Sequence, residues 1–203
     1  MGDLGSFVAE PDVVAAARAT AALWINTYTD DVGRQRSATL SPVRKYGINL
    51  AVGENGIITP DPENEYPAMS FSCPGLYGEP ERHGNGTYEA TFALGVGCVV
   101  ADTSKDAALT GAGWYGAAVA ELFTQQGSLG GFAVETTWLD RETVPIGYEL
   151  DRFVVASTNM FVVRVGGVLH RFTGPRTPPV DPTVAPAGEP LVASTGVTVH
   201  PLA

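Results

Sequence analysis

The chain has 203 residues and a net charge of −10, and 17% of its residues are charged, against about 25% in an average soluble domain. Because phosphate binding requires clustered lysine and arginine, this balance argues against a protein that wraps nucleic acid. The longest apolar run, residues 92–101, is shorter than the roughly 18 residues that a membrane span needs, so no membrane contact is expected. Two cysteines and three histidines indicate neither a disulfide framework nor a metal centre.

The composition changes near residue 172. Residues 173–203 hold seven of the fifteen prolines and no aromatic residue. Such a segment favours extended, polyproline-like conformations and cannot bury a core of its own. We therefore expect a domain over residues 1–172 and a Pro-rich extended tail over residues 173–203 that docks on another surface.

The first expected element is a helix that begins after Asp12 as N-cap and ends near Gly33. Apolar residues recur at spacings of three and four, which indicates one buried helix face. The residues of that face are Val14, Ala17, Ala21, Trp24 and Tyr28. A short strand is expected over residues 46–52.

The clearest strand is expected over residues 88–100. Its residues alternate with a period of two: Tyr88 to Val100 on one face are mostly large and apolar, and the other face carries Gly95 and Gly97. Residues 69–73 are the expected antiparallel partner. The loop between them, residues 74–86, ends in Asn85-Gly86, a strong turn signal.

A second helix is expected from Thr103 or Ser104 to Gly127, with Leu109, Ala112, Tyr115, Val119 and Leu122 at helical spacings. The glycines of residues 129–132 then reverse the chain into strands over residues 133–140 and 153–169. This order predicts an α+β fold: a mostly antiparallel twisted sheet with two main helices packed on one face.

The motifs do not indicate catalysis. Residues 111–116 match GxGxxG, but they lie inside the second helix rather than between a strand and a helix, so we expect close helix packing there instead of a dinucleotide. Cys73 and Cys98 lie in strand-like apolar segments, where cysteine is usually inert core. No catalytic residue, metal ligand or cofactor is predicted, and the chain is expected not to be an enzyme.

Four of the twelve basic residues lie close together at Arg34, Arg36, Arg44 and Lys45. They could contact nucleic acid or an acidic neighbouring protein. The alternative is that cations near a helix C-terminus complement the helix dipole and stay solvated.

Residues 82–142 combine a glycine-rich turn entering the strand of residues 84–97, an Ala-rich helix over residues 107–126, and a Ser-Leu-Gly-Gly-Phe-Ala turn before Trp138. With these features the segment resembles the tail terminator proteins of long-tailed bacterial viruses, especially those of actinobacterial hosts. About 100 residues, 66–168, share the pattern. The resemblance implies a virion protein, assembled in the host cytoplasm, that forms a ring, usually sixfold. Such a ring caps the finished tail tube, ends its polymerisation and meets the head completion proteins.

An acidic ring would let DNA slide through its lumen without holding it. We therefore expect either the acidic loop of residues 53–67 or the hairpin of residues 74–86 to face the lumen or the last tube ring, and the basic run to meet an acidic patch on an adjacent subunit or connector. The candidate interface residues are Arg34, Arg36, Arg44, Lys45, Glu54, Asp61, Glu63, Glu65, Tyr77, Glu79, Glu81 and Arg82.

Two alternatives stay open. The chain could be another head–tail joining protein, such as a connector or stopper, or a tail tube subunit. It could also be a small ligand-binding α+β protein or a hydrolase, which would need a deep pocket with converging polar groups.

Overall fold

The computed structural model describes residues 8–47, 51–52, 58–59, 65–82, 88–149 and 151–166. The expected Pro-rich tail, residues 173–203, lies outside these residues. The elements are, in chain order, α1 (Glu10–Arg36), β1 (Lys45–Tyr46), β2 (Ala51–Val52), β3 (Ile58–Thr59), β4 (Ala68–Leu76), β5 (Glu81–Arg82), β6 (Tyr88–Asp102), α2 (Lys105–Gln125), the 3₁₀ turn η1 (Leu129–Gly131), β7 (Glu135–Glu149) and β8 (Arg152–Val165).

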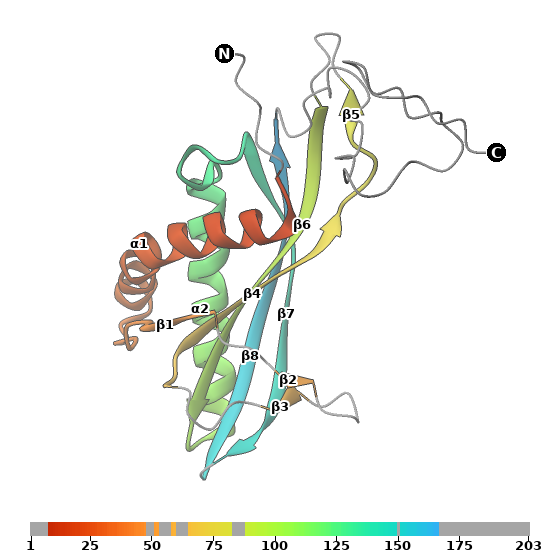
Figure 1. Ribbon diagram of the computed structural model, residues 1–203. Coiled ribbons are helices and arrows are strands. Elements are labelled where there is room, and N and C mark those ends of the chain that lie inside the picture. The colour runs from red at the N-terminus through yellow and green to blue at the C-terminus, as the bar shows by residue number, and fades with distance from the viewer. Residues whose placement is uncertain are drawn as a thin grey trace, which may run out of the picture. The chain divides into compact units, whose positions relative to one another are not determined.

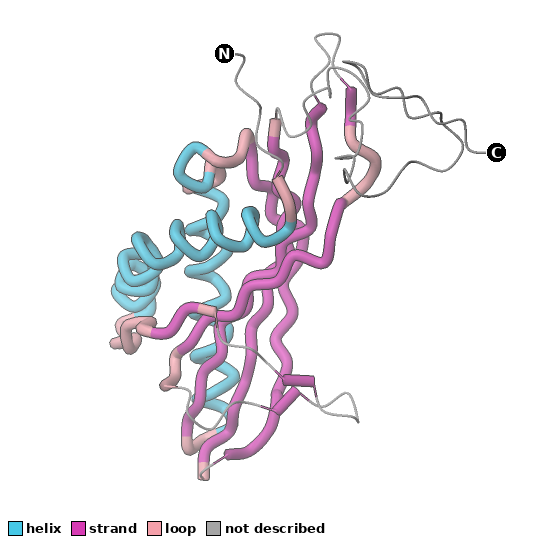
Figure 2. Tube along the Cα trace, in the orientation of Figure 1, coloured by secondary structure: helices cyan, strands magenta, loops and turns pink. Residues whose placement is uncertain are grey.

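The predicted fold class is confirmed. The main sheet has the order β1-β4-β6-β8-β7, and β5 pairs with one end of β6. All of its pairings are antiparallel except the short parallel pairing of β1 with β4. Figure 1 shows both helices on the same side of the sheet, and Figure 2 shows helices and strands as two layers. Helix α1 packs on β4, β6 and α2, whereas α2 packs on β6, β7 and β8.

The start of α1 differs from the prediction. The N-cap is Ala9, and Asp12 lies in the first turn, where its Oδ2 accepts a hydrogen bond from the Ala9 backbone N–H at 2.8 Å. Proline in this first turn is compatible with the helix, because the first backbone N–H groups have no partner within it. The helix therefore begins before Asp12, and the carboxylate stabilises it from inside.

The buried face of α1 is also displaced from the predicted one. Ala17, Ala21 and Tyr28 are buried as expected, but Val14 is only half-buried and Trp24 is 43% exposed. Val13 and Ile25, each one residue away, take their places in the core. Because many residues of α1 are alanine, its apolar periodicity is weak. A face displaced by one residue therefore fits the same three- and four-residue spacing.

The alternation predicted for β6 is confirmed. Ala90, Phe92, Leu94, Val96, Cys98 and Val100 all belong to the core under the helices. On the opposite face, Gly95 faces Ser72 and Gly97 faces Ser70 in β4, and a Cβ at either glycine would meet the serine Oγ at 2.6 Å or less. These pairs of small residues let β4 and β6 approach closely on the face that α1 and α2 leave uncovered.

That second sheet face, hereafter the outer face, is not uniformly open. Val99, Val154, Ala156 and Ile146 form a separate buried cluster there. Nothing in the period-two pattern distinguishes these residues from the solvent-facing positions of the same strands. Tyr66, which precedes β4, packs against this cluster and contributes to its burial.

Helix α2 follows its prediction closely. The Ser104 side chain caps it by accepting a hydrogen bond from Ala107, and the helix ends at Gln125. Of the three motif glycines, only Gly116 provides the expected close packing: a Cβ there would meet the Ser157 Oγ of β8 at 2.1 Å. A Cβ at Gly113 would meet nothing within 4 Å, so the prediction was wrong for that position.

Of the last two strands, β7 is longer than predicted. β7 runs to Glu149, nine residues beyond the expected end, with register shifts at 138/140 and 145/147. It includes Pro145, which a strand tolerates at a sheet edge, where one side needs no ladder hydrogen bond. The expected strand over residues 46–52 is instead two strands in different sheets, β1 and β2.

Candidate interaction surface

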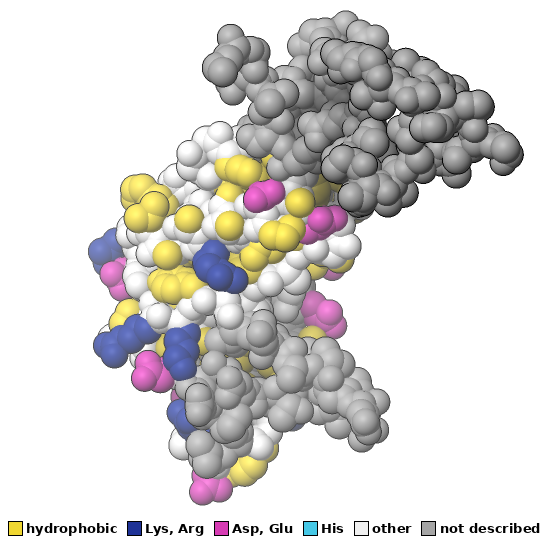
Figure 3. Space-filling view, in the orientation of Figure 1, with side chains coloured by type: hydrophobic (Ala, Val, Ile, Leu, Met, Phe, Trp, Pro, Cys, Tyr) yellow, Lys and Arg dark blue, Asp and Glu magenta, His cyan; other side chains and the backbone are white. Residues whose placement is uncertain are grey.

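The predicted basic residues gather on one side of the domain. Arg34 and Arg36 lie in the last turn of α1, which agrees with a helix-dipole role, and Arg34 forms an ion pair with Asp31. Arg44 is exposed and Lys45 is the first residue of β1. In Figure 3 most of the dark-blue side chains lie over the part of the surface that α1 and the segment after it occupy.

Side-chain hydrogen bonds to the Val43 backbone hold the segment that connects α1 to the sheet edge. The Asn26 side chain accepts a hydrogen bond from the Val43 backbone N–H at 2.8 Å and donates one to the Val43 carbonyl at 3.2 Å. The Tyr46 hydroxyl donates to the same carbonyl at 3.1 Å. Because Val43 is fixed in this way, Arg44 and Lys45 lie beside α1.

Two further residues bear on this basic surface. A Cβ at Gly47 would meet the Arg18 guanidinium at 2.7 Å, so Arg18 lies against the turn that follows β1. Glu65 lines the same shallow hollow as Arg44. One residue of the predicted acidic loop is therefore close to the basic run of its own chain.

The remaining predicted interface residues are only partly described. Tyr77 is 54% exposed, and Glu79 and Glu81 are exposed at the far end of β4 and in β5. Arg82 is described only as a strand residue of β5. Glu54, Asp61 and Glu63, as well as the Asn85-Gly86 turn, lie outside the described residues.

The structure reveals a surface that the sequence reasoning missed, at the β7 edge of the main sheet. Five large apolar side chains of this segment are between 42% and 61% exposed: Val134, Trp138, Leu139, Val144 and Tyr148. Within the described part of the chain, β8 is the only strand hydrogen-bonded to β7, although β3 lies against it. The available signal was the β-branched and aromatic residues that continue past Asp140, at Thr143, Val144, Ile146 and Tyr148.

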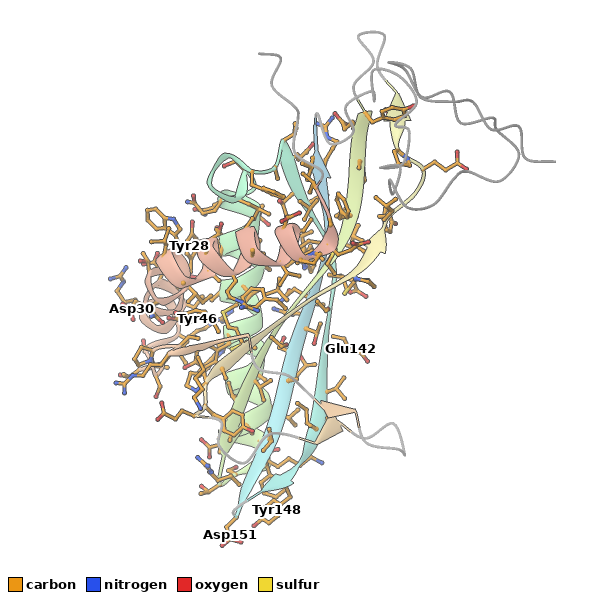
Figure 4. All side chains as sticks on the ribbon, viewed as in Figure 1. Tyr28, Asp30, Tyr46, Glu142, Tyr148 and Asp151 are labelled. Carbon is orange, nitrogen blue, oxygen red and sulfur yellow. The ribbon has the colours of Figure 1, made fainter. Side chains whose placement is uncertain are left out.

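The outer face near this edge carries mostly carboxylates. Arg164 bridges Glu89 and Glu135, at 3.1 Å to each carboxylate. Asp140 and Glu142 are exposed, and no salt bridge to either is found among the described residues. Arg141, between them, reaches the other way and donates to the Gly113 carbonyl of α2 at 3.4 Å. In Figure 4 Glu142 projects away from the helices, on the opposite side of the sheet from Asp30 of α1.

A second hollow, lined by residues of α2 and by Ser41 and Tyr66, has a volume of about 500 Å³. Its polar groups are engaged locally: the Asp102 carboxylate accepts from the Ser104 backbone N–H, and the Tyr115 hydroxyl donates to the Ser41 carbonyl. The described lining residues include neither histidine nor cysteine.

Cys98 lies in the core as expected, whereas Cys73 is only partly buried against it. Cys98 is fully buried, and this burial raises the pKa of its thiol to about 12. Burial also raises the pKa of the half-buried Cys73. Among the described residues there is no group of three or more potential metal ligands, and no described helix is long and apolar enough to cross a membrane.

Comparison with known proteins gives a weak structural likeness. No protein-family model and no curated protein matches the sequence. A solved chain described as "Virion of native gene transfer agent (GTA) particle" is similar over 76% of this chain and 95% of its own length, at 12% identity and a TM-score of 0.43. A TM-score this low establishes no shared fold or role.

Proposed function

We propose that the protein is a structural component of a virus-like particle, and specifically a tail terminator that forms a ring at the head end of the tail tube. The observation that carries the proposal is the sequence resemblance over residues 66–168, whose strands and helix occupy β4, β6, α2, β7 and β8. The ring would end tube polymerisation and present a face to the head completion proteins.

The geometry supports a subunit that associates with other proteins. A 15-residue edge strand with exposed Trp138, Leu139 and Tyr148 is a costly feature for a monomer, because unpaired strand edges and apolar patches favour association. The uncovered outer face bears an excess of carboxylates. Repeated around a ring, such a face would repel DNA phosphates, so that the genome could pass without being held.

Electron microscopy and native mass measurement of the purified protein test this proposal. A terminator should form closed rings of one size and should shorten the polymers that tail tube subunits form when the two proteins are mixed. Long stacked tubes of this protein alone would favour a tube subunit instead. A monomer at all concentrations, with no effect on tube length, would contradict the proposal.

The ligand-binding alternative has the 500 Å³ hollow in its favour. It predicts that a small molecule binds there and raises the melting temperature by mass action. Substitution of Trp114, which lines the hollow, would then abolish that shift.

A further inference from the structure

We propose that neighbouring copies of this chain join head to tail, with the basic side of one copy against the acidic edge of the next. The basic side comprises Arg18, Arg34, Arg36, Arg44 and Lys45. The acidic edge comprises Glu135, Asp140 and Glu142 together with the exposed apolar residues Trp138, Leu139, Val144 and Tyr148 of β7. This inference rests on the proposed function and names the partner of each surface.

The two surfaces lie at opposite ends of the sheet. β1 is at one end of the strand order and β7 is at the other. Helix α1, which packs beside β4, lies on the β1 side. A contact between two different surfaces of the same chain is heterologous, and repeating it gives a closed ring when the rotation between copies closes.

Their charges are complementary. On the basic side, the acidic residues among the described ones are Asp30, Asp31 and Glu65, against five cations, so the described part of this surface has an excess of positive charge. On the acidic edge, Arg164 is shared by Glu89 and Glu135, which leaves Asp140 and Glu142 without a cation among the described residues. Charges arranged in this way favour the head-to-tail contact and disfavour like edges meeting.

Both surfaces also offer apolar area. Leu23 is 76% exposed and lies 11 residues before Arg34, about three helical turns, so the two share one face of α1. Trp24 beside it is 43% exposed. The acidic edge offers Trp138 and Tyr148 at 46% and 61% exposure. Trp138 and Tyr148 lie on the helix-facing side of β7, whereas Asp140 and Glu142 lie on the outer face, so aromatic and acidic groups occupy the two sides of the same sheet edge. Aromatic residues are enriched at interfaces.

Charge reversal on each side provides the test. Arg34→Glu/Arg36→Glu makes both sides of the chain acidic, and Asp140→Lys/Glu142→Lys makes both sides basic. Each variant alone should remain monomeric, with association at least about tenfold weaker than in the unchanged protein. An equimolar mixture should reassemble, because acidic-sided and basic-sided copies can alternate around an even-numbered ring.

Two controls separate charge pairing from loss of folding. Lys105→Glu and Glu121→Lys on α2 reverse charges outside both surfaces and agree with the helix dipole, so they should leave assembly unchanged. The neutral pairs Arg34→Ala/Arg36→Ala and Asp140→Asn/Glu142→Gln should weaken assembly less than reversal does, and should make it less sensitive to salt.

The possible results are distinct when assembly is measured by analytical ultracentrifugation and microscopy. Loss of rings in each reversed variant, with recovery in the mixture, supports the inference. Intact rings in either reversed variant, or no recovery in a mixture of two folded variants, overturns it while the proposed ring remains. A monomeric unchanged protein overturns both the inference and the proposed function.

Discussion

At the scale of single residues, the contact between α2 and the sheet depends on the absence of a side chain at Gly116. A Cβ there would meet the Ser157 Oγ at 2.1 Å and the Ser157 Cβ at 3.0 Å. The serine belongs to a central strand, so the helix itself would have to move away. Gly113, one turn earlier on the same helix, has open space around it.

We therefore expect Gly116→Ala to lower the free energy of unfolding by about 1–3 kcal/mol, the usual effect of overpacking. The matched variant Gly113→Ala should be neutral or stabilising by up to about 1 kcal/mol, because alanine favours the helix. Urea denaturation of both variants measures the difference. Equal effects at the two positions would show that the helix–sheet contact is not closely packed at Gly116.

A second residue-scale consequence concerns alkaline pH. Burial raises the pKa of the Cys98 thiol from its ordinary value of 9.0 to about 12 in the folded protein. Between these values the unfolded chain binds fewer protons than the folded one, so the free energy of unfolding falls as pH rises. The slope from this group begins at about pH 8 and approaches about 1.4 kcal/mol per pH unit above about pH 10.

Cys98→Ala should flatten this slope between pH 9 and 10.5 when urea denaturation is repeated across the range. Burial also raises the pKa of Tyr115, so some decline should remain at higher pH. An identical slope in the variant and the unchanged protein would mean that the thiol ionises freely in the folded state.

At the scale of elements, Asn159 fixes α2 and β7 to the central strand β8. Its side chain is fully buried, donates to the Gly116 carbonyl at 3.2 Å and accepts from the Trp138 indole N–H at 3.2 Å. A buried amide with both ends satisfied orients the surfaces that it joins. It therefore helps to set the position of β7, including its exposed edge.

Asn159→Ala should lower the free energy of unfolding by about 1–3 kcal/mol, because buried polar partners lose their hydrogen bonds. The control is Thr158→Ala, which changes the neighbouring residue on the opposite face of the same strand. Thermal and urea unfolding measure both variants, and tryptophan fluorescence follows the environment of Trp138. If Asn159→Ala costs no more than its control, the amide does not fix these elements together.

At the scale of the whole molecule, the helices and main strands of the described domain share one core. The buried cluster under the helices draws on residues from Val13 to Val165. The sequence prediction that residues 173–203 serve a partner contact concerns a segment outside the described residues and stays a prediction.

Removal of residues 175–203 should therefore leave the melting temperature almost unchanged while weakening assembly with a partner protein. Calorimetry and native mass measurement of the truncated and full chains check the two parts separately. A truncated protein that unfolds would show that the tail belongs to the core. Unchanged assembly would remove the proposed partner role.

The sequence by itself determined the local elements that carry strong periodic signals. β6 was predicted from its alternation over residues 88–100, and α2 from Ser104 and the apolar spacing after it, because pleat and helical turn impose these periods directly. The weaker pattern of Ala-rich α1 led to a buried face displaced by one residue. Of the candidate interface groups predicted from the sequence, the basic run is the one whose four side chains all lie within the described part of the structure.

The tertiary structure alone decided which surfaces are sheet edges and which charges lie together. Strand order placed β1 and β7 at opposite ends of the sheet, so Arg36 and Glu142 lie on different sides of one subunit. It also joined Glu89, Glu135 and Arg164 from three different strands. Such neighbours depend on long-range pairing, which no local period encodes, and this is why the apolar and acidic edge along β7 became visible only in the folded chain.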